Sequence, residues 1–143
     1  MRLPDHYRNA ILDEFDQVCK LMAGTADPGE KLYYFSATHG VLNRVMNLHF
    51  DPLLVFAHQV LQTCGQGFSA RLTQAVGPVE LFRAHADVLF ANLAEAVRDL
   101  RAAVESDDDS QMRLVLQHVD LLGYATTGNG LYLYVTGKLK LSA

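Results

Sequence analysis

Apolar residues recur every three to four positions along five stretches of the chain, which is the spacing of one face of an α-helix. In the first stretch Tyr7, Ile11, Phe15, Val18 and Met22 fall on one stripe. Polar residues occupy most of the positions between them, as in a helix with one buried face. The predicted helices span residues 4–23, 28–48, 52–76, 78–105 and 107–122.

The four prolines support these boundaries, because each stands at the start of one of the helical patterns. Proline is favoured in the first turn, where its missing N–H would have no helical partner and its φ is already suitable. Asp27 before Pro28, followed by Glu30, is typical of a capping box. The apolar register of 52–76 continues across two internal glycines, so we expect one helix there.

Short links separate the five helical patterns, and short links make consecutive helices antiparallel. A chain of 143 residues, half of them hydrophobic, is long enough for one buried core. The sequence therefore predicts a mainly-α fold: an up-and-down antiparallel bundle of about five helices in a single domain, residues 1–143.

The C-terminal segment, residues 129–143, has a different pattern. It is rich in glycine and threonine, which are poor helix formers. From Leu131 onward, apolar residues alternate with tyrosines and a lysine, which favours a β-hairpin turning at Thr136 and Gly137. A short amphipathic helix from Leu131 to Leu139 is the alternative. The hairpin is the favoured prediction.

Charge is distributed unevenly, and residues 32–70 are nearly devoid of it. Arg44 and Asp51 are the charged residues of this stretch of thirty-nine, where the average of the chain would give about eight. Charge depletion is typical of interface cores, and two-fold dimers are the commonest oligomers. We expect a homo-oligomer in which helices 28–48 and 52–76 meet their symmetry mates. The alternative is that these helices are the central pair of a monomeric bundle.

Nucleic acid and membranes are not expected partners. The net charge is −4, and no cluster of Lys and Arg offers a phosphate-binding patch. The uncharged segment 53–70 carries Gln59, Gln62, Gln66 and Ser69 on one helical face, which excludes a continuous apolar membrane span.

The expected compartment is the cytoplasm. No basic and then apolar stretch typical of a signal peptide opens the sequence. Cys19 and Cys64 have no paired spacing, so we interpret them as reduced thiols in or near the core.

Four histidines lie one to a helix on or beside the apolar stripes: His39, His58, His85 and His118. Imidazole is the commonest metal ligand in proteins, so a tetrahedral metal site or the axial pair of a haem is one hypothesis. Neither Glu-x-x-His nor His-Glu-x-x-His occurs, and a lone histidine on an apolar stripe is more often a hydrogen-bonded core residue. No cofactor is therefore expected.

Helix 28–48 also carries a polar stripe that combines donors, acceptors and one basic charge. Uncommon polar groups in an apolar setting form an internal network or bind a ligand. The network is the favoured interpretation, and a pocket of unknown ligand is the alternative. The residues of the stripe are Tyr33, His39, Asn43, Arg44 and Asn47.

Three hypotheses about function follow. The favoured one is a homo-oligomeric protein-interaction or scaffold module without catalytic activity, because charge depletion is present and the common catalytic motifs are absent. The second is a binder of a small ligand, a metal ion or haem. The third is an enzyme with its site on the polar stripe. Under the first hypothesis, Leu61→Glu is expected to break the dimer.

Overall fold

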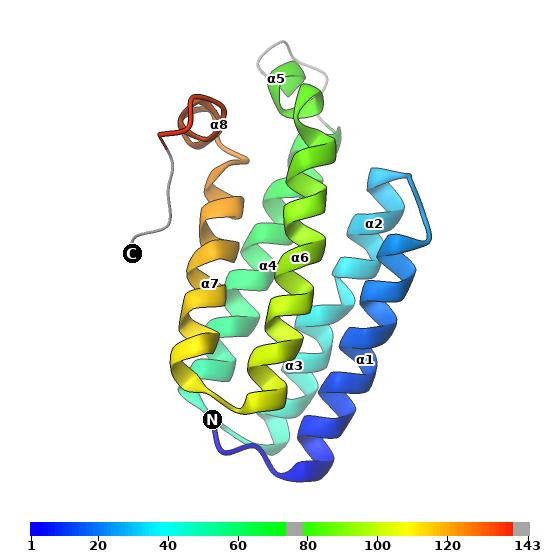
Figure 1. Cartoon of the computed structure of the whole chain (residues 1–143), viewed down its shortest axis with the longest axis vertical. Helices are drawn as coiled ribbons and strands as arrows, with labels where there is room; N and C mark the ends of the chain where they lie inside the picture. The colour runs from blue at the N-terminus through cyan, green and yellow to red at the C-terminus, as the bar shows by residue number, and fades with distance from the viewer. Residues whose placement is uncertain (74–78, 139–143) are drawn as a thin grey trace.

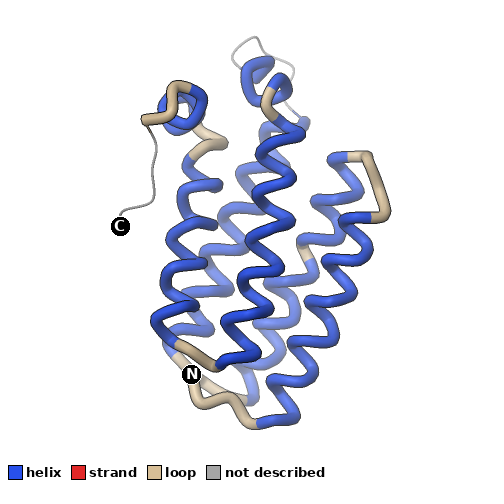
Figure 2. Tube along the Cα trace, in the orientation of Figure 1, coloured by secondary structure: helices blue, strands red, loops and turns tan. Residues whose placement is uncertain are grey.

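The computed structural model describes residues 1–73 and 79–138, and all regular secondary structure in them is helical (Figure 2). The mainly-α class is thereby confirmed. The described residues contain no helix that is long and apolar enough to cross a membrane. The helices are α1 (Asp5–Ala23), α2 (Pro28–Phe35), α3 (Ala37–Leu48), α4 (Pro52–Thr73), α5 (Val79–Ala84), α6 (Ala86–Ser106), α7 (Asp109–Tyr124) and α8 (Gly128–Val135).

The count of about five helices was wrong, because the described residues form eight, and one reason is a break at Ser36. The Ser36 hydroxyl donates to the carbonyl oxygen of Tyr33 at 2.5 Å, and the Thr38 hydroxyl donates to that of Phe35 at 2.8 Å. Such side-chain donors compete with the helical N–H groups for the same carbonyls. The segment predicted as one helix, 28–48, is consequently divided into α2 and α3.

A second break falls at His85, inside the predicted helix 78–105. His85 has φ −110° and ψ 8°, outside the helical region, and its Nδ1 lies 3.0 Å from the carbonyl oxygen of Leu81. This divides the segment into α5 and α6. The predicted helix ends at residues 74–76 and 78 lie outside the described residues.

The five long elements pack in a closed circular order: α1 on α6, α6 on α7, α7 on α4, α4 on α3, and α3 on α1 (Figure 1). Consecutive elements alternate in direction. A closed ring of five elements cannot alternate in direction throughout, so one neighbouring pair must be parallel. That pair is α4 and α7, and both helices run away from the end of the bundle that holds the α3–α4 turn. Small residues let this pair approach closely: a Cβ on Gly123 would lie 3.5 Å from the Cα of Cys64.

The core is formed by the inward stripes of these helices. The stripe of α1 is buried at Ile11, Phe15, Val18 and Met22. Near the C-terminal end of α4, the ring of Phe68 lies edge-on to the rings of two phenylalanines from α5 and α6. The ring centroids are 5.7 Å apart for Phe68 and Phe82 and 5.1 Å for Phe68 and Phe90.

The predicted C-terminal hairpin was wrong: Leu131, Leu133 and Val135 lie on α8. The side chain of Thr127 caps this helix by accepting from the N–H of Gly130 at 3.1 Å. A Cβ on Gly130 would lie 1.9 Å from the carbonyl oxygen of Tyr124, so glycine is required where α8 folds back on α7.

The expected hairpin turn, Thr136 and Gly137, instead follows the end of α8, where Gly137 has a φ of 72°. The alternative prediction, a helix from Leu131 to Leu139, has the correct type of structure. The observed helix starts three residues earlier and ends at Val135, and Leu139 lies outside the described residues.

Candidate functional site

The outward surface of residues 32–70, which include the second half of α2, all of α3 and most of α4, is almost free of charge. Of the exposed side chains in residues 32–70, Arg44 is the one that carries a charge, and it is ion-paired with Glu14 of α1. By contrast α6 exposes Asp87, Glu95, Arg98, Asp99 and Glu105. We call the uncharged surface the neutral face. It comprises Tyr33, Ser36, His39, Asn43, Asn47, Phe56, His58, Gln59, Gln62, Gln66 and Ser69, which are exposed or half-buried.

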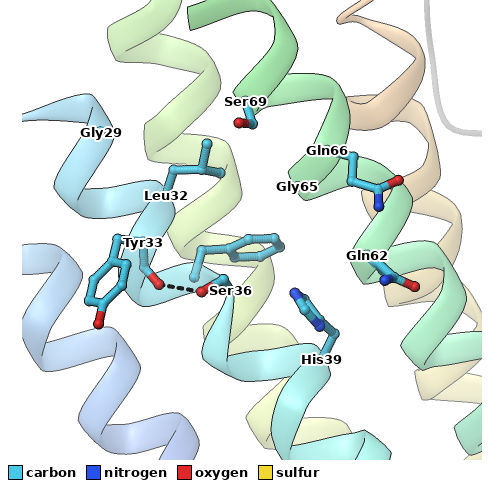
Figure 3. Close-up of a pocket in the computed structure, with 10 residues that line it drawn as sticks. Gly29, Leu32, Tyr33, Ser36, His39, Gln62, Gly65, Gln66 and Ser69 are labelled. Atoms are coloured by element: carbon cyan, nitrogen blue, oxygen red, sulfur yellow. Dashed lines mark hydrogen bonds between the residues drawn. The ribbon is translucent and has the colours of Figure 1, made fainter. Parts of the chain in front are cut away.

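A pocket of about 390 Å³ opens on the neutral face between α2, α3 and α4. Figure 3 shows Ser36 and His39 on one side of it and Gln62, Gln66 and Ser69 of α4 on the other. Leu32 and the buried ring of Phe35 supply the apolar part of its lining. The lining contains no charged residue, so the pocket suits a neutral group rather than an ion-paired one.

Most polar side chains around this pocket make no hydrogen bond to the described residues. The Ser36 hydroxyl is used at the helix break, where it bonds the carbonyl oxygen of Tyr33 (Figure 3). Within residues 1–73 and 79–138, the side chains of His39, Gln62, Gln66 and Ser69 make no hydrogen bond to another residue. These four side chains retain free donors and acceptors, which water, a ligand or a second protein can satisfy.

The rings of His39 and His58 meet across the α3–α4 interface. Their centroids are 5.8 Å apart and their planes are inclined at 76°. Burial, and then the neighbouring His58, lowers the pKa of His39 below its ordinary value. This lowering favours the neutral form of the His39 imidazole.

The polar stripe expected from the sequence is divided by the fold. Tyr33 and His39 line the pocket just described. Arg44 is directed toward α1 and, again with Tyr33, lines a second hollow of about 560 Å³ between α1 and the α2–α3 segment. Asn43 and Asn47 are exposed on α3 and line neither hollow. The five residues are consequently not brought together in one site.

The four histidines proposed as metal ligands are also separated. His39 and His58 meet, whereas the ring of His85 contacts the Leu81 carbonyl at the α5–α6 break, and His118 is half-buried on α7. In the part of the chain that the structure describes, no group of three or more His, Cys, Asp or Glu could hold a metal ion.

The residues missing from the sequence-based site are Gln62, Gln66 and Ser69, which form the α4 side of the pocket. Their common helical face was visible in the sequence. What the sequence lacked was the neighbour of that face, because periodicity shows that residues share a side of a helix and not which helix they meet.

Cys64 is buried where α4 meets α7, and we expect its thiol to be inert. Burial, with a smaller contribution from the charge of Asp120, raises the pKa of the Cys64 thiol to about 12. At pH 7.5 its thiolate fraction is then about 1000-fold below that of an ordinary cysteine. Reaction of the Cys19→Ser variant with Ellman's reagent should therefore be at least about 100-fold slower in buffer than in 6 M guanidinium. Reaction at similar rates in the two solvents would contradict this.

Comparison with known proteins adds no relative whose function could be carried over to this surface: no family model, no curated protein and no solved structure matches the chain.

Proposed function

We propose that the chain is a non-catalytic interaction module that forms a homodimer through the neutral face. The observation that carries this proposal is the scarcity of charge on the outward surface of residues 32–70, where Arg44 is the one exposed charged residue, while α1 and α6 expose charges of both signs. Interface cores are depleted of charged residues relative to the remaining surface.

The composition of the neutral face favours a second copy of the chain as the partner. In a two-fold dimer the same patch faces itself, so any charge near the axis meets a like charge. Amides and hydroxyls are both donors and acceptors and can pair with their own kind. Gln59, Gln62, Gln66, Asn43 and Asn47 supply such groups on adjacent helices.

Apolar side chains on and beside the neutral face support the same proposal. Leu48 and Phe50, at the α3–α4 turn, are 70% and 76% exposed, and Tyr33 is 75% exposed. Phe56, one turn into α4, is 48% exposed. Aromatic residues are enriched in protein interfaces, where they contribute a large contact area. Their burial against a second copy would stabilise the dimer.

The test is sedimentation velocity of the wild type and of the double variant Gln59→Glu/Gln66→Glu. The wild type is expected to be dimeric at micromolar concentrations. The variant places like charges opposite each other in the dimer, and its dissociation constant is expected to rise by about 100-fold or more. Gln117→Glu, the same change at an exposed position of α7, is the control.

Two results would contradict the proposal: a wild type that is monomeric at 100 µM, or a double variant with the affinity of the control. Leu61→Glu, which the sequence suggested as the dimer-breaking change, is unsuitable. Leu61 is fully buried in the core, so a carboxylate there would unfold the chain.

A second candidate function is the binding of a small neutral molecule, and it is favoured by the free donors and acceptors around the 390 Å³ pocket. Native mass spectrometry of the purified protein tests it. The expected result is a bound mass that is lost in Gly65→Leu, because a side chain at this position enters the pocket. Protein without added mass would argue against a ligand retained from the cell.

A further inference from the structure

His39 and His58 are the two histidines of the neutral face. They come from facing positions on α3 and α4, and their ring centroids are 5.8 Å apart. Neither ring makes a hydrogen bond to another residue in the described part of the chain, and both side chains are half-buried. Both rings therefore have nitrogen atoms available for a ligand.

The separation of the rings is close to that of two imidazoles bound to one metal ion. A zinc–nitrogen bond is about 2.0–2.1 Å long, and tetrahedral ligation then puts two ring centroids about 5 Å apart. Rotation of half-buried side chains is sufficient to cover the difference. Imidazole coordinates metals in its neutral form.

One chain cannot complete such a site. No third His, Cys, Asp or Glu joins the pair among the residues that the structure describes, whereas a tetrahedral ion binds four ligands. The proposed dimer can supply the missing ligands, because a two-fold axis that passes beside His39 and His58 places the same histidines of the second copy opposite the first pair.

We propose that the His39–His58 pairs of two copies bind one divalent ion of the zinc, copper and nickel class between them. The choice of metal follows from the ligands: imidazole suits these ions, while magnesium and calcium require oxygen ligands. The neutral face offers no carboxylate. This inference rests on the proposed homodimer and gives it a regulator, since a shared ion stabilises the dimer.

Zinc sulfate added to protein freed of metal with EDTA tests the inference, by isothermal titration calorimetry and sedimentation velocity on the same samples. One zinc ion is expected per two chains, together with a decrease of at least 10-fold in the dimer dissociation constant. His39→Gln and His58→Gln should each weaken zinc binding by 100-fold or more. His118→Gln, a half-buried histidine on α7, is the matched control and should bind zinc as the wild type does.

The outcomes separate this inference from the proposed function. A dimer that binds no zinc, or zinc binding that survives both pair substitutions, overturns the inference and leaves the dimer in place. One zinc ion per chain overturns the shared site. A chain that is monomeric in EDTA and dimeric with zinc overturns the metal-free dimer and supports the histidine site. Circular dichroism of each variant checks that the helices are retained.

Discussion

Replacing Phe68 with alanine is expected to lower the free energy of unfolding by about 3–5 kcal/mol. The ring is fully buried and lies edge-on to Phe82 and Phe90, so its removal leaves a cavity where α4, α5 and α6 meet. Aromatic pairs of this geometry also contribute beyond their buried area. Urea denaturation followed by circular dichroism at 222 nm, at one protein concentration, measures the change.

Leu114→Ala is the control, because Leu114 lies on α7, outside the neutral face, and is 61% exposed. Its substitution is expected to cost less than about 1 kcal/mol. If both variants lost the same amount, Phe68 would not be the packing centre that the structure indicates.

Gly67→Ala is expected to destabilise the fold by about 1–3 kcal/mol, although alanine is the better helix former. A Cβ at Gly67 would lie 2.5 Å from the Thr126 hydroxyl oxygen and 3.2 Å from the Thr126 Cβ. Thr126 cannot retreat easily: its hydroxyl donates to the Gly123 carbonyl at 2.6 Å, and its own carbonyl accepts from Arg71 Nε at 2.5 Å. The contact between α4 and the link from α7 to α8 must therefore open.

Gly65→Ala should instead stabilise the fold. We expect the free energy of unfolding to rise by up to about 1 kcal/mol, because alanine has the higher helix propensity. A Cβ at Gly65 meets the Phe35 ring at 3.5 Å, an ordinary van der Waals distance. The two glycines are two residues apart on one helix, so the same denaturation experiment compares them directly. Equal stabilisation by both substitutions would contradict the close contact between Gly67 and Thr126.

The starts of the helices were predictable because they depend on local chemistry. Asp27 accepts from the N–H of Glu30 at 3.0 Å with Pro28 as the first helical residue, and α4 begins at Pro52 as expected. The breaks at Ser36 and His85 were not predictable in the same way. A helix break of one residue barely shifts the apolar stripe. The hydrophobic periodicity therefore continues across the break and does not reveal it.

The C-terminal segment was assigned incorrectly because its glycines were interpreted as evidence against a helix. Two of them lie in the first turn of α8, where Gly130 permits the close approach to the Tyr124 carbonyl. Burial of Leu131 then helps to hold the segment in place. Tertiary packing of this kind overrides intrinsic propensity and cannot be inferred from alternation alone.

For the candidate site, the sequence showed which residue types are present but not which helices bring them together. The depletion of charge in residues 32–70 was visible, and so was the helical face that carries Gln62 and Gln66. Of the four histidines, the structure pairs His39 with His58 because α3 packs on α4. Such pairings depend on which helices are neighbours, and that is a property of the three-dimensional arrangement.

The packing of α1 on α6 has a consequence for the chain as it leaves the ribosome. More than sixty residues separate the end of α1 from the start of α6. At a synthesis rate of about 5–20 residues per second, roughly 3–12 s pass between the end of α1 and the start of α6, the helix that covers much of the apolar stripe of α1. During that interval Ile11, Phe15 and Met22 are at most partly covered, by α2 and α3. The nascent chain thus offers chaperones a binding surface that the finished protein conceals.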